Sequence, residues 1–403
     1  MKKNVLITGA TGYVGRRLKQ LLLKRDDLNI RLMVRDKNKL DPSIHAKEKE
    51  GKLQIVEADT FNPKSLEAAL ENIDTAFYLI HSMGGKNSDF EAKDRKSAEN
   101  FRDACIGAGV KRVIYLGGLG AKKSASKHLL SRIETGEILS GRKDKIQTIW
   151  FRAGIIIGSG SASFEIVRHL IHKLPVMITP KWVNTVTQPI AVDDVLAYLE
   201  SAIDADIEGD LIVDIGTSPM NFKQMMQETA KVMGLNRFLL PVPVLTPKLS
   251  SYWLVLFTPV PLKMASALIE GLKSETILLN DHAQRYFPKV KPMSFNQAVK
   301  LAIDEIEQRQ VISRWCDSSE DNSCSLAEFD SPAVVGESAG AVLRDERKFS
   351  ISKVSKDKLF ASVCSLGGEN GWFAFDFLWE IRGVIDKLSG GVGLNRGKRT
   401  YEN

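Results

Sequence analysis

The strongest constraint on the fold lies in the first fifteen residues, where glycine recurs at every third position. Gly9, Gly12 and Gly15 separate a short apolar run, 5–7, from a segment with helical apolar spacing, 13–24. The first glycine permits a tight strand-to-helix turn, the second lets a pyrophosphate approach the backbone, and the third lets the helix pack closely. Amides at the helix N-terminus then face the phosphates. In this context the spacing predicts a dinucleotide-binding loop, against the alternative of a turn that binds nothing.

Strands and helices alternate through the first half of the chain. Apolar runs predict strands at 30–34, 53–57, 75–80, 112–116 and 146–151, with helices at 65–71, 90–108 and 126–140. Such alternation of mostly apolar strands with helices predicts an α/β fold, a doubly wound parallel sheet of Rossmann type with helices on both faces. We assign this NAD(P)-binding core to residues 1–160.

Shorter elements follow the core. The pattern predicts helices at 164–173, 193–203, 221–233, 264–273 and 295–310, and strands at 188–192 and 211–215. Insertions after a doubly wound core lie at the carboxyl ends of its strands. We therefore expect residues 161–310 to form a smaller substrate lobe that is interleaved with the core sheet.

The composition changes near residue 311. A polar stretch, 317–325, and a stretch poor in large apolar residues, 330–341, precede an aromatic run, 372–379, and a glycine-rich run, 390–399. Residues 311–403 are therefore predicted to be a separate segment, and we expect the chain to stop inside a domain.

Bulk composition excludes several classes of protein. The 403 residues carry a net charge of +7, and their lysines and arginines are scattered, so no nucleic-acid-binding stripe is predicted. The four cysteines form no C-x-x-C pair, which argues against zinc and disulfides and favours the cytoplasm. The apolar stretch 238–262 is broken by prolines, so no transmembrane helix is predicted. We expect this stretch to form a lip over a pocket, or a surface patch for a partner or a peripheral membrane contact.

The ends of the predicted strands supply the remaining cofactor contacts. The expected set is Gly9, Thr11, Gly12, Tyr13, Val14, Gly15, Arg35, Asp59, Leu79 and His81. Arg35 follows the second strand, and a guanidinium pairs well with a 2′-phosphate, so NADP is favoured over NAD. Arg16 and Arg17 are expected to add positive charge nearby. The alternative is that Asp36 turns inward and Arg35 is solvated.

Two further positions at strand ends have competing interpretations. Asp59 is placed to reach the adenine amino group, or else it caps the turn at Asn62-Pro63. His81 is expected to be the most exposed of Leu79, Ile80 and His81 beside the pyrophosphate path, although a lone histidine is more often a neutral structural group.

These residues resemble the atypical short-chain dehydrogenase/reductases of the NmrA-like type. The similarity rests on the segment Thr8-Gly9-Ala10-Thr11-Gly12-Tyr13-Val14-Gly15, on Arg35-Asp36, on Asp59 and on the segment from Gln188 to Val195. It covers about residues 1–305. The tail resembles the start of the DUF2867 domain through Gly371-Trp372, Leu378-Trp379, Arg382-Gly383, Asp386-Lys387-Leu388 and Arg396-Gly397-Lys398-Arg399. This second resemblance implies an incomplete α+β domain of the START-like helix-grip type.

Active members of the reductase family use Ser, Tyr and Lys, with Tyr and Lys four residues apart on one helix face. Here Gly117-Gly118 stands where serine is expected, and the next helix carries His128 and Arg132 at that spacing. His128 is predicted to act as a general acid, and Arg132 to bind ribose hydroxyls or a substrate anion. The alternative is that both only hold cofactor or lie on a solvated face. Asn100 matches in position a helix-organising asparagine of the family, or else it is an exposed polar residue.

The segment 180–189 is a candidate substrate wall, with Trp182 offering an apolar face and Gln188 an amide. A loop tryptophan is as often a packing anchor. Asp193-Asp194 is predicted to be a helix N-terminus rather than a catalytic carboxylate pair.

Three functions compete. The first is an NADP-dependent oxidoreductase that acts on a small carbonyl or quinone-like substrate. The second is a non-catalytic NADP(H)-binding sensor, scaffold or assembly factor with a degenerate site. The third and weakest is a nucleotide-sugar epimerase, because the Tyr-x-x-x-Lys pair is absent. A small-molecule ligand is expected in each case, and the oligomeric state is not predicted.

Overall fold

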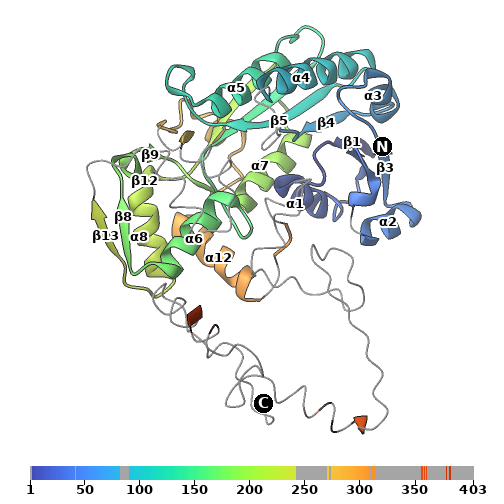
Figure 1. Ribbon diagram of the computed structural model, residues 1–403. Coiled ribbons are helices and arrows are strands. Elements are labelled where there is room, and N and C mark those ends of the chain that lie inside the picture. Colours follow the sequence, from blue (N-terminus) through green and yellow to red (C-terminus); the bar gives the residue numbers. More distant parts are fainter. Residues whose placement is uncertain are drawn as a thin grey trace.

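A sheet of seven parallel strands forms the centre of the molecule in the computed structural model (Figure 1). The structure describes residues 2–40, 42–81, 90–241, 270–271, 274–308 and 311–313, with isolated positions between 355 and 382. The strands are β1 Lys3–Ile7, β2 Leu28–Val34, β3 Leu53–Glu57, β4 Thr75–Tyr78, β5 Arg112–Gly118, β6 Gln147–Ala153 and β11 Leu211–Ile215. Their order is β11-β6-β5-β4-β1-β2-β3. Because β1 pairs with both β2 and β4, the direction of winding reverses at β1, and the predicted doubly wound sheet is confirmed.

Helices cover both faces of this sheet. One face carries α1 Tyr13–Leu22 and α7 Val192–Asp204, and the other carries α3 Pro63–Leu70, α4 Phe90–Gly107 and α5 Lys127–Leu139 (Figure 1). The first layer packs Leu18 and Leu199 on the sheet, and the second packs Leu66 and Phe101, all fully buried. The strands between them read as continuous apolar runs because both of their faces are covered.

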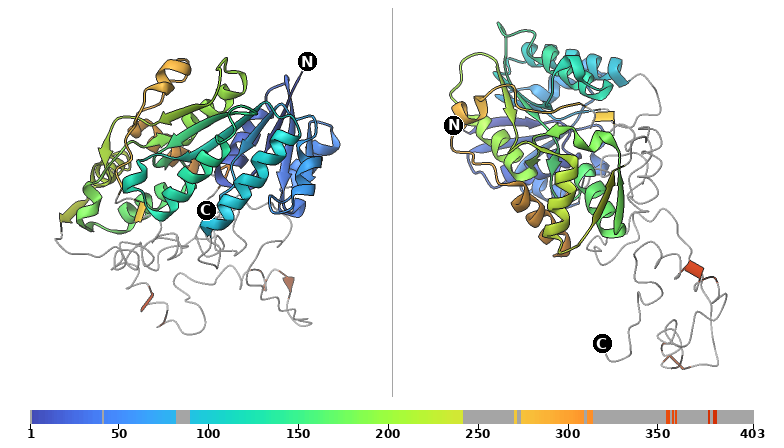
Figure 2. Two further views of the ribbon diagram at one scale, coloured as in Figure 1. Left: turned by 90° about the horizontal axis from the view of Figure 1, so that it is seen from above. Right: turned by 90° about the vertical axis from the view of Figure 1, so that its left-hand side faces the viewer.

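A second apolar cluster forms a smaller lobe beside the sheet (Figure 2). Its helices are α6 Ala162–Lys173, α8 Phe222–Val232 and α12 Phe295–Glu307. Short pieces complete it: β7 Ile156–Ile157, β8 Val176–Thr179, η3 Lys181–Asn184, β9 Val186–Thr187, β10 Ile190–Ala191, β12 Met220–Asn221 and β13 Phe238–Pro241. From the range 161–310, α7, β11 and the short helix α11 His282–Tyr286 pack in the core layers.

Most predicted elements within the described ranges occur, with ends that differ by a few residues. The predicted strand at 188–192 is reduced to β10, and Pro189, which has no amide to donate, precedes it. The helix α2 Pro42–Lys49 was not predicted, since Ile44 is its only large apolar side chain. η1 Lys37–Lys39 and η2 Lys122–Ser124 were also not predicted. The predicted helix at 264–273 and nearly all of 311–403 lie outside the described residues.

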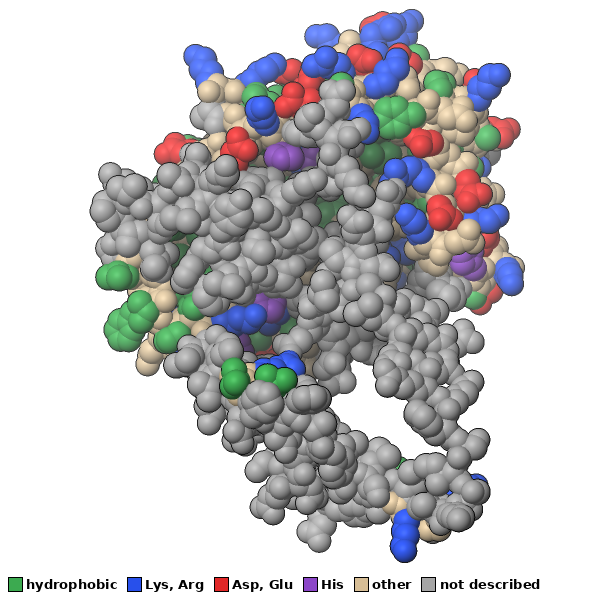
Figure 3. Space-filling model, in the orientation of Figure 1, with side chains coloured by type: hydrophobic (Ala, Val, Ile, Leu, Met, Phe, Trp, Pro, Cys, Tyr) green, Lys and Arg blue, Asp and Glu red, His purple; other side chains and the backbone are tan. Residues whose placement is uncertain are grey.

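The apolar stretch 238–262 is described only at its first residues. There Phe238 and Leu240 of β13 are 72% and 55% exposed, and Val176 of the paired strand β8 is 50% exposed. Figure 3 shows hydrophobic side chains on the surface at this end of the molecule. Across the described part of the chain no helix is long and apolar enough to cross a bilayer, and no side-chain group could hold a metal ion.

Candidate functional site

The glycine loop brings three backbone segments into direct contact. Gly9 has a positive φ of 63°, and a Cβ there would lie 2.5 Å from the carbonyl oxygen of Leu79 at the end of β4. A Cβ at Gly15 would lie 2.1 Å from the carbonyl oxygen of Gly9. Side chains at either position would push β1, β4 and α1 apart. The Thr8 hydroxyl also joins these strand ends, since it donates to the Phe77 carbonyl (2.9 Å) and accepts from the Leu79 amide (3.1 Å).

The start of α1 has the form of an anion site. Gly12 is the N-cap residue, with extended backbone (φ −78°, ψ 171°) and no side-chain cap. A Cβ added there would meet a single atom within 4 Å, the Gly9 carbonyl oxygen at 3.2 Å. A phosphate can therefore approach the helix N-terminus, where the backbone dipole favours negative charge. The residues present fit a dinucleotide diphosphate.

Two side chains in this helix point away from the loop. Arg17 was expected to add charge near the cofactor, but that expectation is wrong, because its side chain is 1% exposed and its Nη2 lies 3.2 Å from Glu305 Oε2 in the smaller lobe. Its Nη2 also donates to the Ser159 hydroxyl at 2.7 Å. The buried hydroxyl of Tyr13 lies against Gly158, and burial raises the pKa of this phenol. Tyr13 therefore offers the loop only its backbone.

For the residues after β2, one interpretation was that Asp36 turns inward while Arg35 is exposed to solvent, and the structure shows this arrangement. Asp36 turns to its own chain, where its carboxylate accepts from the Asn38 amide at 2.9 Å and caps η1. Arg35 is exposed at the end of the strand. Arg16 donates to the Thr11 carbonyl at 3.0 Å, which holds its guanidinium over the loop.

The loop after β3 is held by its own side chains. The Asp59 carboxylate accepts from the Phe61 amide at 2.9 Å, so the turn-capping interpretation describes what the structure shows. An adenine contact by Asp59 stays a prediction. Asn100 of α4 donates to the Thr60 carbonyl at 2.7 Å and is half-buried, so the exposed interpretation of Asn100 is wrong.

A polar cluster lies where β4 ends beside the glycine loop. The side chain of His81 is 17% exposed, and α4 supplies Asp94 at 3.2 Å from its Nδ1. Ser131 of α5 donates to the same carboxylate oxygen at 2.9 Å. Burial lowers the pKa of His81, and Arg132 and His128 lower it further, while the hydrogen bond to Asp94 opposes the shift. Arg132 and His128 are therefore close enough to His81 to act on its charge.

The predicted catalytic pair is arranged differently from a Tyr–Lys pair. Arg132 Nη2 donates to the Leu116 carbonyl at 2.9 Å, so part of its guanidinium is bound to the end of β5. His128 is half-buried at the start of α5, and Ser126 caps that helix by accepting from the Leu129 amide. The Tyr115 hydroxyl donates to the Arg132 carbonyl at 2.9 Å, and burial raises the pKa of Tyr115 to about 12.

Packing explains why serine is missing after β5. A Cβ at Gly117 would lie 2.4 Å from Trp150 Nε1, and one at Gly118 would lie 2.6 Å from Leu129 Cδ1. Any side chain at these two positions would collide with the indole or with α5. The site therefore lacks a hydroxyl at the place where the resembling family carries one.

The candidate substrate residues are only partly described. Both ends of the Gln188 amide bind backbone, with Nε2 donating to the Thr217 carbonyl and Oε1 accepting from the Leu278 amide, each at 2.7 Å. The structure therefore assigns Gln188 to holding these segments together, and it does not support the predicted substrate contact. Trp182 lies in η3, and its side chain is outside the described residues.

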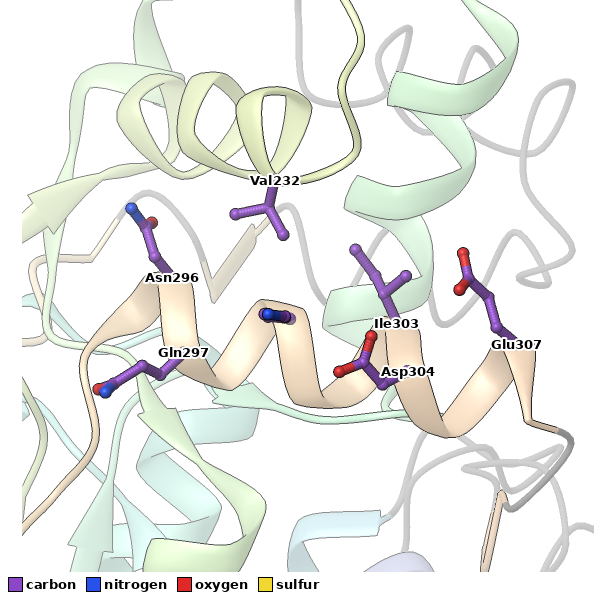
Figure 4. Close-up of a pocket in the computed structure, with 7 residues that line it drawn as sticks. Val232, Asn296, Gln297, Ile303, Asp304 and Glu307 are labelled. Carbon is purple, nitrogen blue, oxygen red and sulfur yellow. The ribbon is translucent and has the colours of Figure 1, made fainter.

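Asp94 and Ser131 were missed by the sequence analysis. Asp94 lies on the same helical stripe as Ala98, Phe101 and Cys105, all buried. A carboxylate within an apolar stripe is costly unless it is paired, and this could have identified it. Elsewhere, an open groove of about 510 Å³ lies between α8 and α12. Figure 4 shows Val232 of α8 above Asn296 and Ile303 of α12, and none of the candidate site residues lines this groove.

Comparisons with known sequences agree with this geometry. Residues 9–147 match the NAD(P)H-binding family, and residues 338–403 match a protein family of unknown function, DUF2867. A curated relative is prestalk A differentiation protein A of Dictyostelium discoideum, 22% identical over 238 residues, which are 58% of this chain and 70% of that protein.

Solved structures share the fold. A nucleoside-diphosphate-sugar epimerase of Staphylococcus aureus superposes with a TM-score of 0.58 at 16% identity, covering 74% of this chain and 99% of that one. The triphenylmethane reductase of Citrobacter sp., complexed with NADP(H), gives a TM-score of 0.57 at 17% identity with the same coverage. At these identities the likeness establishes the fold and nothing finer.

Proposed function

Since this chain carries an NAD(P)-binding domain at residues 9–147 and a DUF2867 segment at residues 338–403, we propose that it is an NADP-dependent oxidoreductase acting on a small carbonyl or quinone-like compound. The main observation in support of this proposal is the geometry of the glycine loop. Its glycines join the ends of β1 and β4 to the start of α1 in backbone contact, and α1 has no side-chain cap. Such a helix start at the switch point of a doubly wound sheet favours a diphosphate.

In this proposal, different residues of the chain bind different parts of the cofactor. Backbone amides from Gly9 to Gly15 hold the diphosphate, Arg35 pairs with a 2′-phosphate, and Leu79 and His81 line the path from the loop toward β5. When bound, the nicotinamide supplies hydride transfer. The polar cluster at the ends of β4 and β5 then has to hold or move the accompanying proton, a role suited to histidine near neutral pH. The fold shared with an NADP(H)-complexed reductase supports this assignment.

A Gly12→Val variant tests the loop. Gly12 has a backbone conformation that any residue adopts, so the fold should survive while the branched side chain blocks the diphosphate. We expect NADPH affinity, measured by titration calorimetry, to fall more than about tenfold. The matched control is Gly107→Val in α4, where a Cβ meets nothing within 4 Å. Unchanged affinity in Gly12→Val would overturn the loop assignment.

A second function, a non-catalytic NADP(H) sensor, is favoured by one observation. The packing at Gly117 and Gly118 leaves no room for the family's serine, and the Arg132 guanidinium binds the Leu116 carbonyl. Tight NADPH binding without turnover of quinones and aldehydes would support the sensor. Turnover that disappears in His128→Ala would support the enzyme with His128 in the reaction.

A further inference from the structure

Three elements converge at His81, the third residue after β4. His81 lies at the carboxyl edge of the sheet, two residues after Leu79, whose carbonyl touches the glycine loop. From α4, Asp94 Oδ2 lies 3.2 Å from His81 Nδ1, and from α5 the Ser131 hydroxyl donates to the same oxygen at 2.9 Å. Asp94 is 5% exposed. This arrangement fixes the direction of the imidazole ring.

The tautomer follows from these partners. A carboxylate at Nδ1 requires the proton on Nδ1, so the neutral ring presents a lone pair at Nε2. His81 Nε2 is buried, and it has no hydrogen-bond partner among the residues that the structure describes. A buried acceptor without a partner costs free energy, and such atoms in native proteins usually have a functional explanation. Leu79, two residues before His81, has its carbonyl against Gly9 of the glycine loop.

We propose that His81 is the proton-transferring residue of this site and binds the reacting oxygen of a hydroxyl or carbonyl compound at Nε2, with Asp94 and Ser131 as positioning residues. The proposal rests on the proposed function. In the oxidative direction the alcohol loses a hydride from carbon to the oxidised nicotinamide and a proton from oxygen. Neutral His81 accepts that proton at Nε2, becomes an imidazolium stabilised by Asp94, and releases the proton to water. In the reductive direction the imidazolium donates the proton to the carbonyl oxygen.

The charged groups facing His81 predict how it titrates. Asp94 from α4 favours the imidazolium, whereas Arg132 and His128 from α5 and the burial of the ring disfavour it, so the pKa of His81 is lowered. Reduction should therefore slow as the pH rises through this pKa, and oxidation should quicken. Tyr115 of β5 stays protonated over this range, because burial raises its pKa to about 12.

The first experiment needs no substrate. Full-length protein with ¹³C-labelled histidine is titrated by NMR, and the His81 resonance is identified by its loss in His81→Gln. We expect its pKa to lie below the usual value for histidine, to fall further in Asp94→Asn, and to change little in the control Asp206→Asn. A pKa that is unaltered in Asp94→Asn would overturn the His81–Asp94 pair.

The second experiment measures NADPH binding and NADPH oxidation with two probes, menadione and 4-nitrobenzaldehyde. We expect His81→Gln to lower kcat about 100-fold or more while the NADPH Kd stays within about twofold, and His282→Gln to change neither. Retained turnover in His81→Gln would overturn the proposal. NADPH binding by the wild type without turnover of either probe would also overturn it and leave the sensor function standing, whereas absence of NADPH binding would overturn the proposed function itself.

Discussion

We expect one arginine at the end of β2, Arg35, to determine which nicotinamide nucleotide the site prefers. Arg35 is exposed, whereas the carboxylate of Asp36 is engaged with the Asn38 amide at 2.9 Å. The unphosphorylated ribose of NAD is usually bound by a carboxylate that accepts from its hydroxyls, whereas the 2′-phosphate of NADP is bound well by the two parallel N–H donors of a guanidinium. We expect Arg35→Ala to weaken NADPH binding about tenfold to 100-fold, because a charge-assisted contact is lost, and to change NADH binding by less than about twofold. Titration calorimetry with each nucleotide measures the difference.

Arg142→Ala is the matched control for Arg35→Ala. Arg142 is exposed in the turn after α5, so its loss alters net charge equally without touching the loop. Both nucleotides should bind this variant as they bind the wild type. An equal loss of NADPH and NADH affinity in Arg35→Ala would assign Arg35 to a contact that both nucleotides share.

At the scale of elements, helix α7 begins with two acids in its first turn, as the sequence predicted. Asp194 is 6% exposed and accepts from the Met293 amide at 2.9 Å. Burial raises the pKa of Asp194 to about 6, and nearby Asp193 adds to the shift, while the hydrogen bond opposes it. The helix start therefore carries a carboxyl group that holds a proton more tightly in the folded state than in the unfolded chain.

This carboxyl group predicts a pH-dependent stability difference. The folded state binds more protons than the unfolded state between about pH 6 and pH 4, so Asp194 adds stability as the pH falls through that range. Asp194→Asn keeps an acceptor for Met293 but cannot titrate. In urea denaturation the variant should be more stable than the wild type near neutral pH, and its advantage should shrink toward about pH 4.

Asp206→Asn, just past the end of α7, provides the comparison for Asp194→Asn. Its urea midpoint should follow that of the wild type at every pH. A stability difference for Asp194→Asn that is independent of pH would show that the carboxyl group titrates normally.

The core elements could be predicted because the pattern that identifies each of them lies within its own short stretch of sequence. Val5, Leu6 and Ile7 are fully buried, so β1 reads as an uninterrupted apolar run, and the glycine spacing encodes backbone geometry directly. The short strands β8, β9, β12 and β13 have two to four residues each and pair outside the main sheet, so no alternation could be recognised.

The site was less predictable than the fold because its contacts join distant elements. His81 follows β4, whereas Asp94 and Ser131 lie on α4 and α5, and only the packing of these elements brings the three residues to one point. The spacing of His128 and Arg132 was visible in the sequence, but the bond from Arg132 to the Leu116 carbonyl depends on how closely α5 lies on β5. The residue types of the site can be read from the sequence, but the groups that these side chains bind depend on how the helices pack on the sheet.

At the scale of the whole molecule, a buried ion pair joins the nucleotide-binding core to the smaller lobe. Arg17 of α1 and Glu305 of α12 lie 3.2 Å apart, with side chains 1% and 17% exposed. The Ser159 hydroxyl binds both of them, and the Ser313 hydroxyl accepts from Arg17 Nε at 3.2 Å and donates to the Tyr13 carbonyl at 2.9 Å. The helix that begins at the glycine loop is thus fastened to the last helix of the smaller lobe.

A double-mutant cycle tests whether this pair couples the two lobes. Arg17→Met should lower the free energy of unfolding by about 3 to 5 kcal/mol, because Glu305 is left as a largely buried carboxylate without its cation. Glu305→Gln should cost a similar amount, since it leaves the Arg17 guanidinium, which is 1% exposed, without its anion. If the pair is coupled, the double variant will be less destabilised than the sum of the single effects, because removing both charges leaves neither one buried alone. Urea denaturation of the full chain measures all four proteins, and strictly additive losses would mean that each residue stabilises only its own lobe.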